Sequence, residues 1–428
     1  MSGSLDLRAC WWVWVPSVLA HRMYVDTPPL GGCLSLPTQG LKTISSNQTL
    51  DNWHTSGWIM KLKCGIGVAL IIAVLPLLAE PTQNLPERST LAGAGFAIQT
   101  SSDGKALKIY IGDQDTVLCM NTQTGQTLWS TRTPYGTVDV GPVLEDGILA
   151  YIGGGGHFAI YALDPATGHQ EWTREHRASL IVAGNGKLFV NTQSGLGIAA
   201  FDLKTGYERW SFSNKPGGSL DRLFYSSGKI YTTDYTLSAA TGHLLSRSKA
   251  AVRAITANDN AVFIADANDD VFAITRQSRK LRWKVQVGKK QEIAGIARTE
   301  SKVFVALYDG YPDSANTGII RGYTADKGLA LWEQKLDARA RSLLWHPIAA
   351  DTNNLYVLMP GGRENETILD AWSVESGKKK WTYSNAGGIV GPIVIVDREI
   401  YANDACGHVY VIDADSGLLL RTLSYRSH

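Results

Sequence analysis

One short sequence pattern recurs eight times along the chain, and it constrains the fold more than any other feature. Most copies contain a turn of the type Thr-Gly or Ser-Gly, and consecutive copies end 36–49 residues apart. The final position is occupied, in chain order, by Trp129, Trp172, Trp210, Ser246, Trp283, Trp332, Trp381 and Arg421. A period of this length is typical of repeat architectures, in which each copy forms one small structural unit.

When the eight copies are aligned on this pattern, two further positions hold residues of one kind in every copy. An aromatic residue lies within an aliphatic or β-branched run upstream of each turn, at Tyr110, Tyr151, Phe189, Tyr231, Phe263, Phe304, Tyr356 and Tyr401. A short polar residue opens each turn, at Asn121, Asp164, Asp202, Ser238, Thr275, Thr324, Ser373 and Asp413. Such residues close turns by hydrogen-bonding the backbone two residues on, and the glycine supplies a positive φ.

These columns predict four short strands in each unit, with the turn joining the third strand to the fourth. In the second unit we expect strands at about 138–144, 147–152, 157–163 and 169–174, and in the eighth at about 389–396, 398–403, 407–413 and 418–424. No 12-residue stretch of 80–428 carries a helical stripe. The sequence therefore predicts an all-β fold over residues 92–428, an eight-bladed β-propeller of four-stranded antiparallel blades.

The tryptophan after each turn has a predicted structural role. Its large ring can lie against the neighbouring unit while its N–H reaches a backbone carbonyl. We assign this docking role to Trp129, Trp172, Trp210, Trp283, Trp332 and Trp381.

The first 91 residues differ from the repeat and are typical of processing segments. Two lysines precede a 16-residue apolar run at 64–79, which predicts an export signal that begins at Met60 and is cleaved before Glu80. Residues 1–59 are then an unstructured extension upstream of the true start, and 80–91 are a linker. The alternative is a translated extension with an uncleaved membrane anchor at 64–79, a run that is short for a span.

Charge excludes one class of partner. Residues 1–79 hold five Lys or Arg and three Asp, so 36 basic and 36 acidic residues remain of the chain's 41 and 39. Residues 80–428 therefore have no net charge, and so no overall positive potential that would attract DNA, RNA or an anionic membrane. We therefore expect no nucleic-acid partner, and membrane contact only through 64–79 if that run is retained. Five cysteines in 428 residues cannot form a disulfide framework.

The repeat resembles the tryptophan-docking propellers of the PQQ-repeat superfamily, the quinoprotein alcohol dehydrogenase-like family, where PQQ is pyrroloquinoline quinone. The segments Asp164–Trp172 and Asp202–Trp210 carry the resemblance most clearly, and it extends over about 92–424. The resemblance implies one of two functions. Quinoprotein dehydrogenases bind PQQ and Ca²⁺ over the central channel, whereas other members are non-catalytic scaffolds closer to this chain in size, an outer-membrane assembly lipoprotein among them.

Several features of the dehydrogenases are missing from the sequence. It has no adjacent cysteine pair, since Cys119 and Cys406 stand in different blades, and no C-x-x-C-H haem site. No family cofactor residue can be carried over position by position. We therefore predict no cofactor, no metal ligand and no catalytic residue, and PQQ with Ca²⁺ only under the dehydrogenase alternative.

Alignment of the innermost strands places three basic residues near one rim of the channel. These are Arg222, Arg253 and His346, which could hold a carboxylate or phosphate by charge-assisted hydrogen bonds. The competing interpretation is that both arginines pair with local acids such as Asp221 or face channel water.

Two loops are longer than their counterparts, at 308–318 in blade six and 360–367 in blade seven. Both belong to the face that carries the second-to-third and blade-to-blade loops. They predict a binding wall containing Tyr308, Asp309, Tyr311, Asp313, Arg363 and Glu364. Ordinary variation in loop length is the alternative.

Three further motifs give weaker signals. The acidic run 266–270 lacks the glycine and distal glutamate of a calcium loop, which favours a solvated loop. The glycines 153–156 precede a strand, so they form no helix-terminal phosphate site. His157 and His408 occupy corresponding places in two blades, and without a third ligand we interpret them as surface residues.

The function that these observations favour is a non-enzymatic, extracytoplasmic binding scaffold. One propeller face would bind a protein or peptide, with the protein either exported or anchored outside the cytoplasm. The alternatives are a PQQ-dependent dehydrogenase-like quinoprotein and a propeller that binds carbohydrate or another small ligand.

Overall fold

The computed structural model describes residues 93–426 apart from residues 135, 193–196, 214–219, 221, 248–249, 277, 279, 289–290, 310–317, 337–347, 362–365, 390–391 and 405. It describes the backbone, and not the side chains, of residues 93, 94, 291, 308 and 309. The predicted extension 1–59, signal or anchor 60–79 and linker 80–91 lie outside the described residues. No helix in the described part of the chain is long and apolar enough to cross a membrane.

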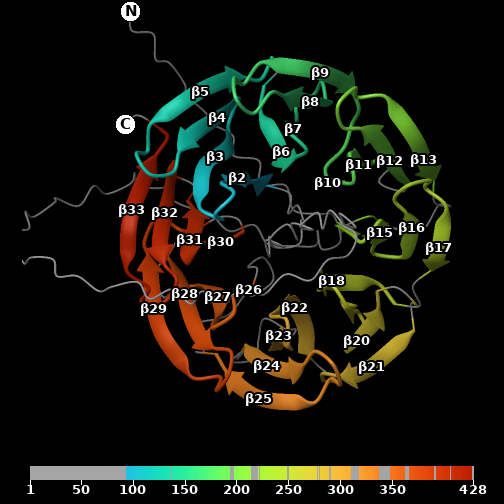
Figure 1. Cartoon of the computed structure of the whole chain (residues 1–428), viewed down its shortest axis with the longest axis vertical. Helices are drawn as coiled ribbons and strands as arrows, with labels where there is room; N and C mark the ends of the chain where they lie inside the picture. Colours follow the sequence, from blue (N-terminus) through green and yellow to red (C-terminus); the bar gives the residue numbers. More distant parts are fainter. Residues whose placement is uncertain are drawn as a thin grey trace, which may run out of the picture. The chain divides into compact units, whose positions relative to one another are not determined.

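The described strands form eight sheets that stand around a common axis, which confirms the predicted eight-bladed propeller (Figure 1). Blade one consists of β2 (Phe96–Thr100), β3 (Ala106–Asp113), β4 (Thr116–Asn121) and β5 (Thr127–Arg132). Blade two consists of β6 (Val138–Glu145), β7 (Ile148–Gly153), β8 (Ala159–Leu163) and β9 (Gln170–Glu175). Blade three consists of β10 (Ile181–Gly184), β11 (Lys187–Asn191), β12 (Gly197–Asp202) and β13 (Glu208–Ser213).

The next three blades repeat this arrangement. Blade four consists of β14 (Leu223–Ser226), β15 (Lys229–Thr232), β16 (Tyr235–Ser238) and β17 (Leu244–Arg247). Blade five consists of β18 (Val252–Ala257), β19 (Ala261–Asp266), β20 (Asp270–Thr275) and β21 (Leu281–Gln286). Blade six consists of β22 (Gln291–Arg298), β23 (Lys302–Asp309), β24 (Ile319–Thr324) and β25 (Ala330–Lys335).

The last two blades complete the ring. Blade seven consists of β26 (Ile348–Ala350), β27 (Asn354–Pro360), β28 (Thr367–Ser373) and β29 (Lys379–Asn385). Blade eight consists of β30 (Val394–Val396), β31 (Glu399–Asn403), β32 (His408–Asp413) and β33 (Leu419–Ser424). A two-residue strand, β1 (Gly93–Ala94), adds to blade two by pairing in parallel with β6.

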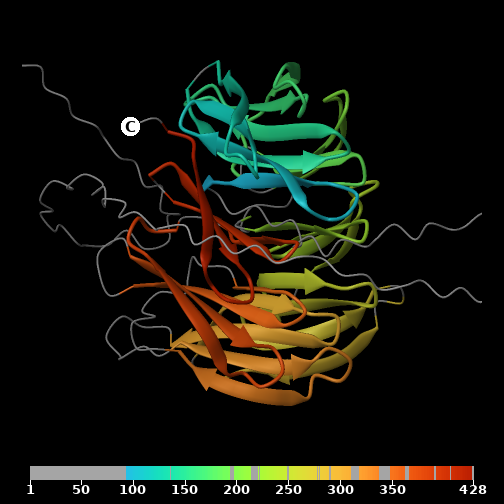
Figure 2. The ribbon, with the colours of Figure 1, turned by 60° about the vertical axis from the view of Figure 1, so that its left-hand side comes forward.

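In each blade the four main strands pair antiparallel and follow chain order from the channel to the outer rim (Figure 1). The turns between strands one and two and between strands three and four lie on the same side of the ring, which we call the hairpin face. The connections between strands two and three and between blades lie on the opposite side, the loop face. Seen from another angle, the strands of each blade run side by side as a twisted sheet (Figure 2).

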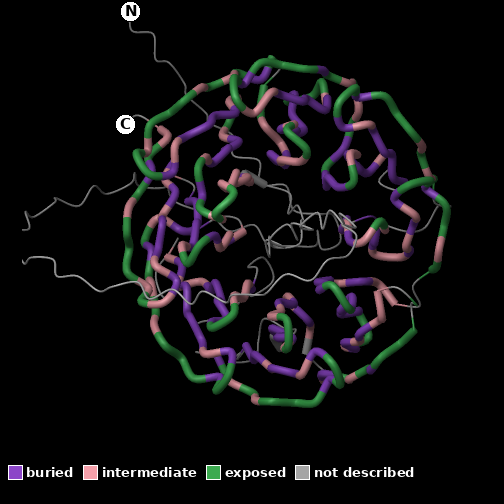
Figure 3. Tube along the Cα trace, viewed as in Figure 1, coloured by how far each residue is buried: buried purple, intermediate pink, exposed green. Residues whose placement is uncertain are grey.

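The core lies between neighbouring blades. Central strands are buried on both faces, as in β19, where all six residues are buried, whereas outer strands such as β5 alternate exposed and half-buried residues (Figure 3). The same packing joins the two ends of the ring, because Ile109 and Ile111 of blade one share an apolar cluster with Val409 and Val411 of blade eight.

The tryptophan at the end of each turn bonds to the following blade. Its indole N–H donates to a backbone carbonyl in the next blade's last turn, at 3.0–3.2 Å. The pairs are Trp129 with Pro165, Trp172 with Leu203, Trp210 with Ala239, Trp283 with Ala325, Trp332 with Val374 and Trp381 with Ala414. In blade eight Arg421 takes the place of tryptophan, and its Nε donates to the corresponding carbonyl of Thr122 at 2.8 Å.

The first strand of blade eight is shorter than expected. The sequence predicts a strand over about 389–396, but β30 covers Val394–Val396, and Ile389 forms only an isolated bridge with Asp404. Pro392 lies between these two segments and has no N–H to donate to a ladder, so regular pairing begins after it.

Candidate functional site

The structure describes two of the three basic residues predicted at the channel rim. Arg222 directly precedes β14 in blade four and is half-buried, and Arg253 lies in β18, the innermost strand of blade five. His346 lies outside the described residues, as does Asp221, the acid proposed as a local partner.

Arg253 joins two blades through an ion pair. Its Nη1 lies 3.1 Å from Oε2 of Glu292, which belongs to β22, the innermost strand of blade six. The arginine side chain is 26% exposed and that of the glutamate 41%, so solvent screens the pair and its contribution to stability is about 0–1 kcal/mol. The ion pair between Arg253 and Glu292 therefore contributes little to stability, and its main effect is to hold two charged groups at the channel.

Glu292 connects this pair to the enlarged loop of blade six. In the ladder between β22 and β23, Glu292 is opposite Tyr308 and Gln291 is opposite Asp309. The backbone of the first two residues predicted for the binding wall therefore runs beside the partner of Arg253. Sequence reasoning missed Glu292, and the bulge between Ile293 and Gly295 interrupts the alternation of side chains that could have identified it.

An aspartate from the loop between β19 and β20 lies within electrostatic range of the same pair. Burial raises the pKa of Asp269, the negative charge of Glu292 adds to this effect, and the positive charge of Arg253 opposes it. The Asp269 side chain makes no hydrogen bond or ion pair within the described part of the protein, and its backbone has a positive φ of 62°. Arg253, Asp269 and Glu292 together form what we call the blade five–six rim, which lies on the loop face.

The run 266–270 is a structured turn and not the solvated loop that the sequence favours. Asp266 and Asp270 are buried, and Oδ1 of Asp266 accepts hydrogen bonds from the backbone N–H groups of Asn268 and Asp270. The Asp270 carboxylate also pairs with Lys284 at 2.6 Å. Turn formation and ion pairing thus occupy two of the acids, and Asp269 is the one that remains.

The other four residues predicted for the binding wall lie outside the described residues: Tyr311, Asp313, Arg363 and Glu364. In blade seven the base of the loop is closed, because the N–H of Gly361 donates to the carbonyl of Glu366 at 2.6 Å. Of the residues predicted for the site, the structure therefore brings together Arg253 and the backbone of Tyr308 and Asp309, where the enlarged loop of blade six begins.

The two histidines differ in their surroundings. His157 is exposed, as expected, but His408 is half-buried, and its Nδ1 lies 2.9 Å from Oδ2 of the buried Asp404. The hydroxyl of Tyr410 donates to the same carboxylate oxygen at 2.7 Å. His408 thus belongs to a buried polar cluster, and no group of three or more His, Cys, Asp or Glu residues in the described ranges is arranged to hold a metal ion.

The propeller is similar to several solved structures, and their low identities show a common fold alone. BamB from Moraxella catarrhalis is 16% identical with a TM-score of 0.55, over 76% of this chain and 99% of that one. The computationally designed Ika8 protein is 15% identical with a TM-score of 0.57, over 76% and 98%. The quinohemoprotein alcohol dehydrogenase ADHIIG from Pseudomonas putida HK5 is 13% identical with a TM-score of 0.51, over 76% and 71%.

Sequence comparison gives a narrower assignment than the fold. No curated protein matches the chain. The profile of the family described as outer membrane protein assembly factor BamB matches residues 81–219 and 316–424, which is more than half of the chain. The chain therefore belongs to the BamB-like family of PQQ-repeat propellers.

Proposed function

We propose that this protein is a non-enzymatic scaffold, exported from the cytoplasm, that binds a protein or peptide on its loop face at the blade five–six rim. Membership of the BamB-like family supports the scaffold role, because the family's name describes an assembly factor. The fold adds a rigid support, since each blade packs on both neighbours.

One observation carries the choice of surface. Among the described residues the Asp269 carboxylate has no hydrogen-bond or ion-pair partner, and it is partly buried and within electrostatic range of a cross-blade ion pair at the base of the enlarged loop. An acidic side chain in this position is suited to accept hydrogen bonds from a lysine, an arginine or a backbone N–H of a bound chain. Arg253 keeps further N–H donors beside its bond to Glu292, and these can donate to a backbone carbonyl of the same partner.

A PQQ-dependent dehydrogenase is the competing function, and it rests on similarity of fold. PQQ carries three carboxylates, so a site for it needs cationic groups that are not already neutralised. Arg253 is already paired with Glu292, and this donor set fits the cofactor poorly. Saturating PQQ and Ca²⁺ should therefore leave the melting temperature unchanged, whereas a ligand that binds the native state would raise it.

The proposal is tested by comparing variants of the two faces in affinity capture from the envelope fraction of the producing cell. Asp269→Ala combined with Glu292→Ala should lose the captured partner. Asp146→Asn, which neutralises an exposed acid on the hairpin face of blade two, should retain it. Retention of the same partner by the double variant would refute binding at this rim.

A further inference from the structure

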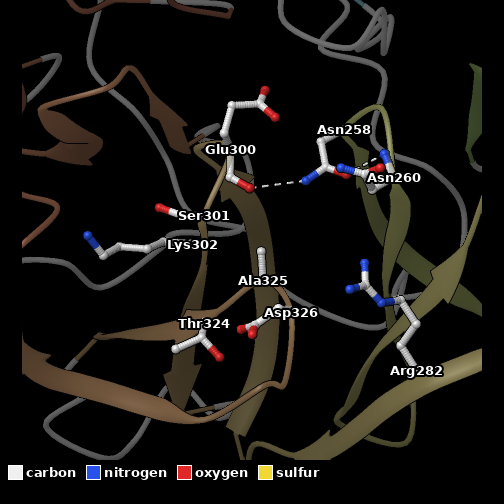
Figure 4. Close-up of a pocket in the computed structure, with 9 residues that line it drawn as sticks. All are labelled: Asn258, Asn260, Arg282, Glu300, Ser301, Lys302, Thr324, Ala325 and Asp326. Atoms are coloured by element: carbon white, nitrogen blue, oxygen red, sulfur yellow. Dashed lines mark hydrogen bonds between the residues drawn. The ribbon is translucent and has the colours of Figure 1, made fainter.

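A polar pocket opens on the hairpin face between blades five and six (Figure 4). Its volume of about 510 Å³ lies within the range of small-molecule sites. Blade five contributes Asn258, Asn260 and Arg282, and blade six contributes residues 300–302 and 324–326 from two of its turns. The pocket therefore lies on the opposite side of the ring from the blade five–six rim.

A β-bulge delivers Arg282 to this pocket. The pairing of β20 with β21 passes from Ala273–Trp283 to Ile274–Leu281, so Arg282 is the extra residue on the outer strand. A bulge re-aims the side chain of its extra residue. Figure 4 shows the Arg282 side chain extending from the outer strand toward the side of the pocket formed by Asn258 and Asn260.

The repeat supplies internal controls for Arg282. In blade three the residue at the same position, Arg209, pairs with Asp202 at 2.7 Å, and in blade seven Lys380 donates to Oδ1 of Asn354 at 2.5 Å. Blade five has Thr275 in place of the aspartate and Ala261 in place of the asparagine. Both acceptors are thus lost, and Arg282 has no hydrogen-bond or ion-pair partner in the part of the chain that the structure describes.

Asp326 shows the same loss with the opposite charge. In blade eight the corresponding residue, Asp415, pairs with Arg398 of the neighbouring turn. The backbone bonds that join these turns, from Ala414 to Arg398 and from Ala325 to Ser301, show that Ser301 occupies the place of the arginine in blade six. Asp326 therefore has no cation partner among the described residues.

The other charges that line the pocket are already satisfied. Glu300 accepts from Arg298 at 3.1 Å, and Lys302 pairs with Glu375. The Asn258 amide donates to the carbonyl of Glu300 at 3.2 Å, as Figure 4 shows. In the described structure the pocket is thus left with one unpaired cation from blade five and one unpaired anion from blade six.

We propose that this pocket binds a short peptide with free ends, with the peptide carboxylate at Arg282 and its ammonium group at Asp326. A guanidinium is the side chain best suited to hold a carboxylate, and a carboxylate accepts the three donors of an ammonium group. The exposed amide of Asn260 and hydroxyl of Ser301 can bond to peptide groups between the two ends. This site is independent of the proposed scaffold function, because it lies on the other face.

Isothermal titration with three tripeptide probes tests the assignment. Triglycine should bind saturably to the full protein, whereas triglycine amide, which lacks the carboxylate, and N-acetyltriglycine, which lacks the ammonium group, should each bind about tenfold more weakly or worse. Equal binding of all three probes, or no saturable binding of triglycine, would overturn the proposal.

Variants then locate the site. Arg282→Gln and Asp326→Asn should each weaken triglycine binding about tenfold, while Arg209→Gln and Asp415→Asn, at the same positions of other blades, should leave it unchanged. Unfolding curves of the single and double variants serve as a second readout. If Arg282 and Asp326 stabilise the fold non-additively and triglycine does not bind, the two residues pair with each other in solution and the proposal is wrong.

Discussion

The indole ring of Trp172 lies against Gly206 of the next blade, so closely that a Cβ at Gly206 would come within 2.6 Å of the ring. The same contact recurs at the other tryptophans, where the added Cβ would meet the ring at 2.5–2.6 Å. Where blade four has Ser246 in place of tryptophan, the turn of blade five has Arg279 in place of glycine. The tryptophan and the glycine thus touch across the blade interface wherever both are present, while blade one keeps Gly125 opposite Arg421 of blade eight.

Substitution of this glycine should destabilise the protein for two reasons. Gly206 has a φ of 67°, which costs a side chain about 1 kcal/mol, and the ring contact adds overpacking of about 1–3 kcal/mol. Gly206→Ala should therefore unfold at lower urea concentration than Gly147→Ala. Gly147 has a similar φ of 75° and nothing within 4 Å of an added Cβ, so it measures the backbone effect alone. Equal losses would show that the ring contact is unimportant.

Arg421 should be a main determinant of ring closure. Besides its bond to Thr122, it donates from Nη1 and Nη2 to the two carboxylate oxygens of Glu399, both at 2.8 Å. We expect Arg421→Ala to lower the free energy of unfolding by about 2–3 kcal/mol, because a half-buried carboxylate loses its partner. Arg132→Ala breaks the exposed pair with Asp115 and should change the free energy of unfolding by less than about 1 kcal/mol. Comparable effects of the two variants in urea titrations would contradict this role.

The pair also predicts a pH dependence. Burial pushes the pKa of Glu399 upward, but hydrogen bonds from Arg421 and Tyr401 outweigh burial and hold that pKa below its ordinary value. A carboxyl with a lowered pKa in the folded state stabilises the protein above its unfolded pKa, and this stabilisation is lost as the pH falls through the folded pKa. The stability difference between wild type and Arg421→Ala should therefore be largest near pH 7 and shrink below about pH 4. A difference in unfolding free energy that stays constant from pH 7 to below about pH 4 would contradict this stabilising role of the pair.

The rim should influence binding far more than stability. Because Arg253 and Glu292 are partly exposed, a double-mutant cycle between them should give a coupling of about 0.2–1 kcal/mol. Glu292→Ala should thus keep a near-normal melting temperature while it weakens partner capture. A large fall in melting temperature would instead assign the pair a structural role.

The blade number and the turn chemistry were predictable because they depend on residues close in sequence. Asp164 shows this, since its side chain accepts from Ala166 and Thr167, two and three residues on. Contacts between blades were harder to predict, because partners such as Arg253 and Glu292 lie 39 residues apart in the sequence and only the closed ring brings them together. Ser246 and Arg421 disrupt the tryptophan column, and sequence alone did not show that the arginine still reaches the same carbonyl.

The acidic turn was misjudged for a related reason. Asp266 and Asp270 read as solvated charges in the sequence, but backbone donors two and four residues after Asp266 and the amine of Lys284 satisfy them. Which acid of such a run remains unpaired depends on strand geometry and not on spacing. This explains why Asp269 and Glu292 emerged only from the structure.

The central claim is that the loop face at blades five and six contacts a protein partner, and site-specific photo-crosslinking tests it most directly. A photoreactive residue at position 292 should give a discrete adduct with an envelope protein, and the same residue at position 204, an exposed position on the hairpin face of blade three, should give none. An adduct from position 204 alone, or none from either position, would contradict the assignment of this surface.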